Sequence, residues 1–323
     1  MTAIDTSTPL PDLQSYLHRR EWLDSEERIT AIEKPGEGNM NVVLRIVTDR
    51  RSFVLKQSRP YVGKYPDVEA PVERIVVEKN FYQAVGDIAV NAHIPNILGF
   101  DSEENLLLLE DLGHCEDMVS LYQKRRIPAK ELDRLVFILG LIHKKDIDDG
   151  FPDNLEMRRL NHQHIFVLPF QERNDFNLDD VHPGLQDLSI PFKTDTALKS
   201  IVNRIGKKYL SPGKTLLHGD YYPGSWMTEG DNLYIIDPEF AFPGFAEFDL
   251  GIMAAHLIMV TGKKEPLNQI HEKYQGDADK KLMDQVAGIE IIRRLIGLAQ
   301  LPLDRSLEEK RRLLKKARTL ILG

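Results

Sequence analysis

The sequence predicts an α+β protein made of a small β-rich N-terminal lobe and a larger, mainly helical C-terminal lobe. Two short runs rich in aliphatic and β-branched side chains, residues 41–47 and 52–56, are separated by a polar turn of hairpin length. Residues 129–147 instead carry apolar side chains at the i, i+3, i+4 and i+7 spacing of an amphipathic helix. Residues 247–323 are also typical of helix for most of their length, so the two parts of the chain differ in kind.

The N-terminal lobe is expected to span residues 1–111. A helix over residues 10–23 is predicted before the hairpin, because its leucines and a tyrosine recur at helical spacing. A second helix is predicted over residues 71–85 for the same reason. The apolar run at residues 105–109 predicts a buried strand at the end of this lobe.

The C-terminal lobe is expected to span residues 112–323. After the amphipathic helix comes a segment rich in proline and asparagine, residues 150–191, to which the pattern assigns no regular structure. A further helix is predicted over residues 194–210, followed by a loop and a short hairpin within residues 216–237.

Composition narrows the function classes. The 323 residues carry a formal net charge of −8, which disfavours a protein built to neutralise nucleic-acid phosphates. The single cysteine, Cys115, excludes a disulfide within the chain and a cysteine-rich zinc site. No apolar run approaches the roughly 20 residues of a membrane span, and the first residues lack the pattern of a signal peptide. We therefore expect a cytoplasmic protein without a nucleic-acid or membrane partner.

Two isolated acids in apolar surroundings are the strongest candidates for chemistry. Asp220 follows His218 and Gly219, where a tight turn can leave its carboxylate projecting from a loop. Asp237 follows a four-residue apolar run, at the end of a predicted strand. One such acid alone would be read as a turn residue. Together, one carboxylate can accept a proton from a hydroxyl and the other can hold Mg²⁺, which is the pattern of a phosphoryl-transfer site.

A glycine-containing turn and a strand lysine support that interpretation. Gly36 and Gly38 precede the run that begins at Asn41, and backbone N–H groups in such a turn can approach phosphates closely. Lys56 ends the second run, where it can neutralise phosphate charge, and Glu78 on the next helix can hold it. No Gly-Lys-Ser/Thr follows, which excludes a P-loop, and a strand rather than a helix follows the glycines, which disfavours a Rossmann site.

Two adjacent arginines stand in an apolar stretch near the C-terminus. Arg293 and Arg294 are flanked on both sides by isoleucine and leucine. Neighbours on a helix diverge by ~100°, so at most one of the two can face water freely. This context favours a functional role over simple solvation.

The order of these motifs resembles the aminoglycoside phosphotransferase and choline kinase superfamily, and within it the methylthioribose kinases. The resemblance rests on six phrases, which run from the first strand to the last helices: residues 38–41, residues 54–57 with 60–62, Glu110-Asp111-Leu112, His218-Gly219-Asp220, residues 237–242 and residues 292–299. The segment 292–299, with its arginine pair, is similar to a helix of the methylthioribose kinases. The resemblance implies a protein-kinase-like two-lobe fold, ATP and Mg²⁺ as cofactors, and a homodimer.

The resemblance also implies roles for residues near the nucleotide. Lys56, paired with Glu78, would contact the ATP phosphates, and the backbone of Glu110, Asp111 and Leu112 would form the hinge that holds adenine. The loop over the nucleotide comprises Gly36, Gly38, Asn39 and Asn41. The metal-binding residues would be Asp237, Glu239 and Ser225, which stands where most of the superfamily has asparagine.

On the acceptor side, the resemblance makes Asp220 the catalytic base and brings Arg293 and Arg294 to the active site. Tyr221 and Tyr222 depart from the Leu-His that methylthioribose kinases carry, and they are expected to shape the acceptor pocket. The expected acceptor is methylthioribose or a related ribose derivative. The alternatives are another hydroxylated acceptor (an aminoglycoside, a choline-like alcohol or homoserine) and a nucleotide-binding pseudokinase.

Overall fold

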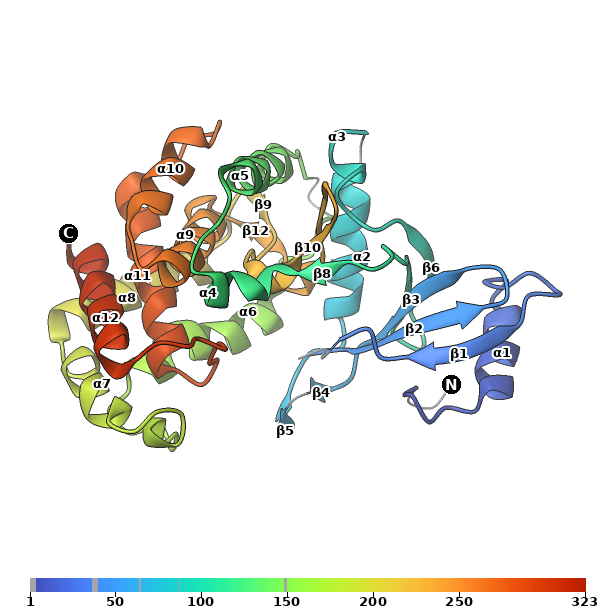
Figure 1. Cartoon of the computed structure of the whole chain (residues 1–323), viewed down its shortest axis with the longest axis horizontal. Helices are drawn as coiled ribbons and strands as arrows, with labels where there is room; N and C mark the ends of the chain where they lie inside the picture. The colour runs from blue at the N-terminus through green and yellow to red at the C-terminus, as the bar shows by residue number, and fades with distance from the viewer. Residues whose placement is uncertain (1–3, 37–39, 64, 87, 148–149) are drawn as a thin grey trace. The chain divides into compact units, whose positions relative to one another are not determined.

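The computed structural model describes all residues except 1–3, 37–39, 64, 87 and 148–149 (Figure 1). It divides into two compact units. Unit 1 comprises Met1–Cys115 with Ile236–Glu239, and unit 2 comprises Glu116–Ile235 with Phe240–Gly323. The lobe boundary after residue 111 stays a prediction about function, because it marks where a nucleotide-binding part would end.

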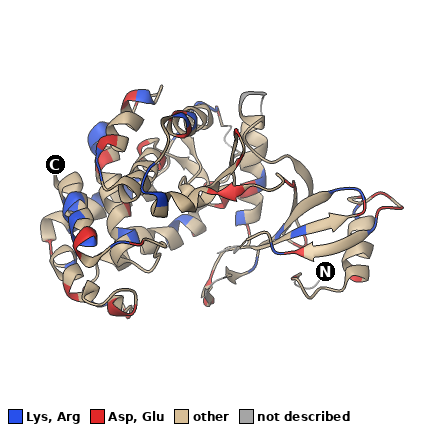
Figure 2. Ribbon diagram, viewed as in Figure 1, with Lys and Arg blue, Asp and Glu red and all other residues tan. Residues whose placement is uncertain are grey.

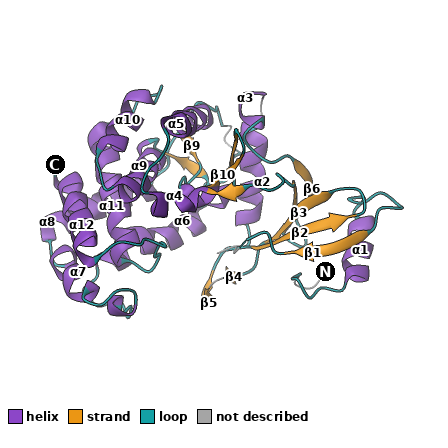
Figure 3. Cartoon of the chain, viewed as in Figure 1, coloured by secondary structure: helices purple, strands orange, loops and turns teal. Residues whose placement is uncertain are grey.

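Among the described residues of unit 1, five strands form an antiparallel sheet in the order β1-β2-β3-β7-β6 (Figure 3). Their bounds are β1 (Ile29–Glu33), β2 (Val42–Thr48), β3 (Ser52–Gln57), β6 (Ile97–Asp101) and β7 (Leu106–Glu110). The short strands β4 (Tyr61–Val62) and β5 (Tyr65–Glu69) pair with each other. The helices of this unit are α1 (Leu10–Arg19), α2 (Arg74–Val85) and α3 (Ile88–Asn91).

Alternation along the strands gives the sheet of unit 1 two covered faces. Leu44, Phe53 and Leu55 point to one face, where they pack in a single core with Leu13 and Leu17 of α1. The other face lies against α2, which contacts β6 and β7. A strand between two covered faces is apolar throughout, and all four leucines of β7 are buried.

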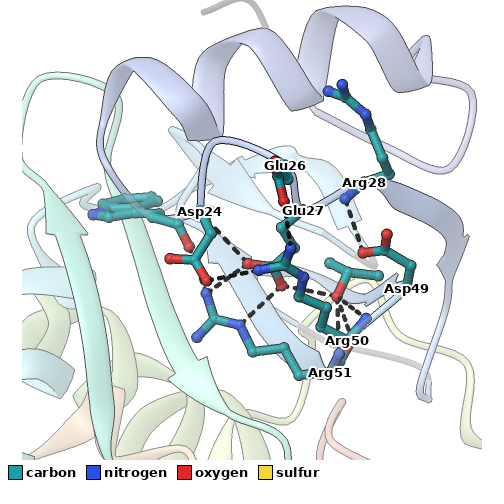
Figure 4. Close-up of polar contacts among 9 residues, drawn as sticks. Asp24, Glu26, Glu27, Arg28, Asp49, Arg50 and Arg51 are labelled. Carbon is teal, nitrogen blue, oxygen red and sulfur yellow. Dashed lines mark hydrogen bonds and ion pairs between the residues drawn. The ribbon is translucent and has the colours of Figure 1, made fainter.

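A polar cluster ties the turn between β2 and β3 to the segment that joins α1 to β1 (Figure 4). We call its six residues the N-terminal clamp: Asp24, Glu26, Glu27, Thr48, Arg50 and Arg51. The Glu27 carboxylate accepts hydrogen bonds from Thr48 Oγ1 at 2.8 Å and from Arg51 Nε at 2.9 Å. Arg50 reaches Asp24 at 3.2 Å and Glu26 at 3.4 Å. The clamp therefore fixes the hairpin at the end remote from Lys56.

Unit 2 is mainly helical. Its helices are α4 (Leu121–Lys124), α5 (Ala129–His143), α6 (Leu155–His162), α7 (Leu185–Lys193), α8 (Thr196–Leu210), α9 (Glu247–Thr261), α10 (Glu265–Lys273), α11 (Lys280–Ile296) and α12 (Leu307–Leu322). Helix α9 is apolar on all sides, as a fully buried helix must be, and it packs against α4, α10 and α11. Helix α11 packs in turn against α12.

Two small sheets carry the loops of unit 2. Strands β10 (Trp226–Glu229) and β11 (Asn232–Ile235) form a hairpin to which β8 (Glu116–Asp117) adds. Strand β9 (Thr215–Leu217) pairs with β12 (Phe242–Gly244), immediately before residue 218. These pairings hold the segment that contains Asp220.

The predicted α+β architecture is confirmed, with differences at element ends. The first helix ends at Arg19, because Glu21 adopts a left-handed φ of 59° that no helix can continue. Strand β1 was not predicted, so the glycine turn lies between two strands and not before the first. The unassigned segment 150–191 contains α6 and most of α7, whose signals are weakened by Asn154 before α6 and Pro191 inside α7.

Charged residues of both signs occur on both units (Figure 2). In the ranges that the structure describes, no helix combines the length and the apolar composition that crossing a bilayer requires.

Candidate active site

Lys56 lies at the centre of a buried cluster in unit 1. Alternation along β3 turns its side chain away from the face of Leu55 and toward α2. Its Nζ donates to Glu78 Oε1 at 2.6 Å and also to Asp237 Oδ1. Lys56 and Glu78 are almost fully buried, whereas the Asp237 side chain is 44% exposed. We call Lys56, Glu78, Tyr82 and Asp237 the Lys56 cluster.

The charge state of Lys56 follows from this environment. Burial disfavours the ammonium, but the carboxylates of Asp237 and Glu78 outweigh burial and raise the pKa of Lys56 well above its usual value. Lys56 therefore stays protonated at neutral pH. Lys56 thus joins the buried carboxylate of Glu78 to the half-exposed carboxylate of Asp237.

Asp237 is held in an uncommon backbone conformation. Its φ is 61°, in the left-handed region, and its N–H donates to the hydroxyl of Tyr82 at 3.2 Å. Such a conformation persists where the surrounding structure determines it. Tyr82 and Lys56 thus fix the direction of the exposed carboxylate from the backbone side and the side-chain side.

The predicted glycine loop is described only at its ends, because Gly38 and Asn39 lie outside the described residues; Gly36 follows β1. Asn41 uses both ends of its side-chain amide. Its Oδ1 accepts from Arg74 Nε at 2.9 Å, and its Nδ2 donates to Glu239 Oε2 at 2.9 Å. The Asn41 side chain therefore anchors the end of the loop, and a nucleotide contact of its backbone stays a prediction.

Glu239 is buried beside Arg74 in unit 1. Burial raises the pKa of Glu239 to about 8, although Arg74, 3.3 Å away, partly opposes this. Its carboxyl group is thus already engaged by Asn41 and Arg74. A second role as a metal-binding acid stays a prediction.

The predicted adenine hinge comprises three consecutive residues: Glu110, Asp111 and Leu112. Both the N–H and the carboxylate of Glu110 are bonded to Asn96, at 2.9 and 2.7 Å. The Asp111 carboxylate accepts from Arg45 at 2.7 Å and from Ser52 at 2.5 Å, and the carbonyl of Leu112 accepts from the Cys115 thiol at 3.0 Å. The side chains of Glu110 and Asp111 therefore stabilise this segment, and adenine binding by its backbone stays a prediction.

Asp220 stands on a tightly held loop in unit 2, directly after β9. The N–H groups of His218 and Gly219 donate to the buried carboxylate of Asp249 at 2.7 and 3.0 Å. Gly219 has a φ of +84°, and a Cβ there would lie 2.1 Å from the carbonyl oxygen of Phe240, so only glycine fits. The loop thus delivers the Asp220 carboxylate in one orientation.

The Asp220 carboxylate is 22% exposed and close to one cation. Its Oδ1 lies 3.4 Å from Arg294 Nη2. Burial raises the pKa of Asp220, although Arg294 and Arg293 partly oppose this. A carboxylate with a raised pKa and an accessible oxygen is suited to accept a proton from a hydroxyl.

The residues after Asp220 divide between the core and the loop. Tyr221 is fully buried, and its hydroxyl donates to the carbonyl of Leu135 at 2.8 Å. The Tyr221 side chain is thus part of the core of unit 2, and its role in shaping the acceptor pocket stays a prediction. Tyr222 is partly exposed, and its ring lies under the Arg294 guanidinium, 5.0 Å from centroid to Cζ. Ser225 is buried, and its hydroxyl donates to the Asp220 carbonyl at 2.8 Å.

Arg293 and Arg294 converge on one buried carboxylate, that of Glu290. Arg294 Nε donates to Glu290 Oε1 at 2.5 Å, and Arg293 Nη1 lies 3.0 Å from both oxygens. His256 Nε2 lies 3.2 Å from Oε1, and Tyr122 Oη lies 2.6 Å from His256 Nδ1. We call Tyr122, His256, Glu290, Arg293 and Arg294 the Glu290 centre. Arg294 thus links Asp220 to a buried polar network.

Burial alone would raise the pKa of Glu290, but Arg293 and Arg294 outweigh it and hold that pKa far below its usual value. Burial would likewise lower the pKa of Arg294, but Glu290 and Asp220 raise it instead. Glu290 is therefore a carboxylate and Arg294 a cation at neutral pH.

Sequence reasoning missed several residues that hold the site. They are Arg74, Tyr82, Tyr122, Asp249, His256 and Glu290. A polar side chain inside an otherwise apolar helix was the available signal for Asp249 and His256, both on α9. For Glu290 the signal was its position three and four residues before the two arginines, a spacing that pairs side chains on a helix.

The oxygen donors fit the Mg²⁺ that the resemblance implies. Mg²⁺ is usually held by one or two carboxylates together with substrate phosphates. Asp237 offers a half-exposed carboxylate in unit 1, and Ser225 offers a hydroxyl oxygen in unit 2. Within the described part of the chain, no three His, Cys, Asp or Glu side chains form a ready metal cage. Within unit 1, the half-exposed carboxylate of Asp237 therefore suits a metal that is bound together with phosphates.

Comparisons with known proteins identify the family of this chain. The family described as "Phosphotransferase enzyme family" matches residues 31–288. A methylthioribose kinase of Exiguobacterium sibiricum is 30% identical over 249 residues, 73% of this chain and 62% of its own length. A methylthioribose kinase of a Geobacillus species is 26% identical over 91% of this chain and 84% of its own. The match to the first of these relatives thus spans less than two thirds of that protein.

Solved structures share the fold. The choline kinase LicA from Streptococcus pneumoniae superposes with a TM-score of 0.54 at 13% identity, over 96% of this chain and 99% of its own. Spectinomycin phosphotransferase APH(9)-Ia, in complex with ADP and spectinomycin, gives a TM-score of 0.57 at 14% identity, over 98% of both chains. The kinase-like fold that the motif order implied is confirmed.

Proposed function

Since this chain belongs to the phosphotransferase enzyme family, we propose that it transfers the γ-phosphoryl group of ATP to a hydroxyl of a small molecule. The acceptor we propose is 5-methylthioribose or a related ribose derivative. The protein would act as an ATP-dependent kinase with Mg²⁺.

The Lys56 cluster carries this proposal. An ammonium bonded at 2.6 Å to a buried glutamate and also to a half-exposed aspartate is the arrangement that phosphoryl-transfer sites of the kinase type use. A lysine paired only with surface acids would have supported no such role. Burial of Lys56 and Glu78 makes a solvated surface pair an unsuitable explanation.

Each residue has a defined task in the proposed reaction. Lys56, oriented by Glu78, binds phosphate oxygens of ATP. Asp220 accepts the proton of the acceptor hydroxyl, and the oxygen of that hydroxyl forms a bond to the γ-phosphorus. The bond from that phosphorus to the bridging oxygen breaks, and ADP leaves with the electron pair. Arg294 lies beside Asp220 and can stabilise the negative charge of the transferred group.

Asp237 and Ser225 are the residues that would hold Mg²⁺. The ion, when bound, supplies neutralisation of charge on the phosphates. Asp237 meets this task because its carboxylate is fixed by Lys56 and its N–H by Tyr82, so its direction is set before any ligand arrives.

Two observations favour a neutral or anionic sugar as acceptor. The relatives with 26–30% identity are methylthioribose kinases. In addition, Arg294 with its ring partner Tyr222 lies next to Asp220. A guanidinium there would repel an aminoglycoside, which carries several ammonium groups, and would suit sugar hydroxyls.

The test is ADP release by the purified chain with ATP and Mg²⁺ against a panel of acceptors. The panel comprises 5-methylthioribose, ribose, choline, homoserine and spectinomycin. We expect the highest kcat/KM with 5-methylthioribose. Faster turnover with spectinomycin or choline would overturn the proposed acceptor and leave the kinase activity standing. No ADP release with any compound, together with intact nucleotide binding, would favour a pseudokinase.

A further inference from the structure

Glu290 is a fully buried carboxylate with three hydrogen-bonding partners. Its side chain has no exposed surface, and it binds Arg294 Nε at 2.5 Å, Arg293 Nη1 at 3.0 Å and His256 Nε2 at 3.2 Å. All three partners are themselves buried or nearly so. A fully desolvated carboxylate with three donors is expensive to build, because each charge loses its water.

Arg294 divides its contacts unequally between two carboxylates. Its distance to Glu290 is 2.5 Å, and its distance to Asp220 is 3.4 Å. Charge-assisted bonds of this type are normally about 2.7–2.9 Å, so the contact with Asp220 is long. Glu290 therefore binds the guanidinium tightly, and Asp220 makes only a long contact with one of its nitrogens, Nη2.

The unequal contact matters for a proton acceptor. A guanidinium free to turn would form two parallel bonds with an aspartate, and these would occupy both of its oxygens. Both Asp220 oxygens would then hold a charge-assisted bond, which stabilises the ionised carboxylate and makes it a weaker acceptor of the hydroxyl proton. The Glu290 bond to Nε fixes the guanidinium in an orientation from which a single nitrogen approaches Asp220.

Glu290 is itself held from behind. A carboxylate only accepts hydrogen bonds, so His256 Nε2 must donate to it, and Nδ1 must accept from the Tyr122 hydroxyl. Burial lowers the pKa of His256 to about 4, which leaves the imidazole neutral. Two arginines then face two carboxylates, Glu290 and Asp220, and the charges sum to zero.

We propose that Glu290 is a positioning residue that keeps Arg294 beside Asp220 without allowing the two to pair fully. The inference rests on the proposed function, because it takes Asp220 as the proton acceptor. It adds a residue that touches neither substrate and acts through Arg294.

A double-mutant cycle tests this role. The variants are Glu290→Gln, Arg294→Gln and the two combined, assayed with 5-methylthioribose or with the panel acceptor that the wild-type chain phosphorylates fastest. We expect Glu290→Gln to lower kcat about 100-fold, as a displaced catalytic geometry does, with the KM for ATP unchanged. The double variant should be no slower than Arg294→Gln alone, because Glu290 then has nothing left to position.

Glu309→Gln is the matched control. Glu309 binds Arg305 at 2.9 Å with the same i, i+4 spacing, and Arg305 is also buried, but neither contacts Asp220. This control should lose stability and keep its kcat. If Glu290→Gln does not fold, Glu290→Asp replaces it, because aspartate keeps the charge and withdraws the carboxylate by one methylene.

The outcomes separate the two claims. A folded Glu290 variant with wild-type kcat, or losses that multiply in the double variant, would overturn the positioning role and leave the kinase assignment intact. A wild-type chain that phosphorylates no acceptor would overturn the proposed function and this inference with it.

Discussion

Two charged clusters in this chain use the same chemistry in different surroundings. In the N-terminal clamp, Glu27 is buried, but its partner Arg51 is 45% exposed, and Arg50 meets two exposed acids. In the Glu290 centre, both arginines are at most 12% exposed and the carboxylate is fully buried. The outer residues of the clamp (Figure 4) are exposed to water, whereas Arg294 of the Glu290 centre contacts Asp220.

The difference separates a cluster that supports folding from one to which we assign a role in the reaction. Exposed ion pairs contribute about 0–1 kcal/mol each to the free energy of unfolding. The arginines of the clamp are exposed, so water also solvates their charges. A buried pair is rarely more stable than apolar residues of the same shape. The Glu290 centre therefore needs an explanation other than stability, and its contact with Asp220 provides one.

The largest effect is expected at the end of the Glu290 centre. Asp220→Asn removes the proton acceptor while it preserves the shape of the side chain. We expect kcat to fall by about 10²–10⁴-fold, the usual contribution of a general base. Steady-state kinetics with the best acceptor measures this, and Glu26→Gln in the clamp should leave kcat unchanged.

Asp237→Ala serves as a comparison, because it should change nucleotide binding, which Asp220→Asn should leave intact. It should weaken binding of Mg-ATP, because the acid proposed to hold the metal is gone, whereas Asp220→Asn should not. Calorimetric titration of both variants gives the comparison. Equal nucleotide affinities would mean that the two acids have been assigned the wrong roles.

The second prediction compares two buried glutamates directly. Glu290→Ala leaves two enclosed guanidinium groups without their carboxylate, and we expect a loss of about 3–5 kcal/mol in unfolding free energy. Glu27→Ala leaves Arg51, which water can reach, so we expect a loss of only about 1–3 kcal/mol. Urea unfolding of both variants measures the difference. Equal losses would show that exposure of the arginine does not decide the cost.

The hairpin and the face of the sheet on which Lys56 lies could be predicted because local rules determine them. Strands β2 and β3 start and end within one residue of the predicted runs, since alternation and a polar turn specify a hairpin. The same alternation places Lys56 on the α2 face. Strand β1 was missed because its residues alternate poorly, and it becomes a strand through pairing with β2.

The rest of the site depends on tertiary packing that no local pattern specifies. Tyr221 and Tyr222 are neighbours of the same type, yet one packs in the core and the other lies beside Arg294. The Glu290 centre requires α11 to pack against α9, which brings together residues 34 positions apart. Chemistry-bearing residues could be named from the sequence, but the residues that position them could not.

The third prediction concerns pH and belongs to the Glu290 centre alone. The pKa of His256 is about 4 in the folded chain and near 6.5 when unfolded. Between these values the unfolded chain binds a proton that the folded chain does not, so stability falls as pH drops from 6.5 to 4. The loss attributable to His256 is at most roughly 3 kcal/mol.

His256→Gln tests it, because glutamine can donate to Glu290 and accept from Tyr122 without titrating. Urea unfolding of both proteins at pH 6.5 and at pH 4.5 gives the comparison. The variant should lose less stability than the wild type over this interval. If both proteins lose the same unfolding free energy between pH 6.5 and pH 4.5, groups other than His256 cause the acid sensitivity.

The smallest effect is expected within the clamp, at Arg50. Its partners Asp24 and Glu26 are 75% and 84% exposed, and the contacts are 3.2 and 3.4 Å long. Solvent screens such pairs, so Arg50→Ala should lower the unfolding free energy by at most about 1 kcal/mol, and by less at high salt. Arg51→Ala is the internal reference, because it strips a buried carboxylate of its cation and should cost more. Urea unfolding at low and high salt measures both, and an Arg50 variant as unstable as the Arg51 variant would mean that the exposed half of the clamp holds the hairpin as firmly as its buried half.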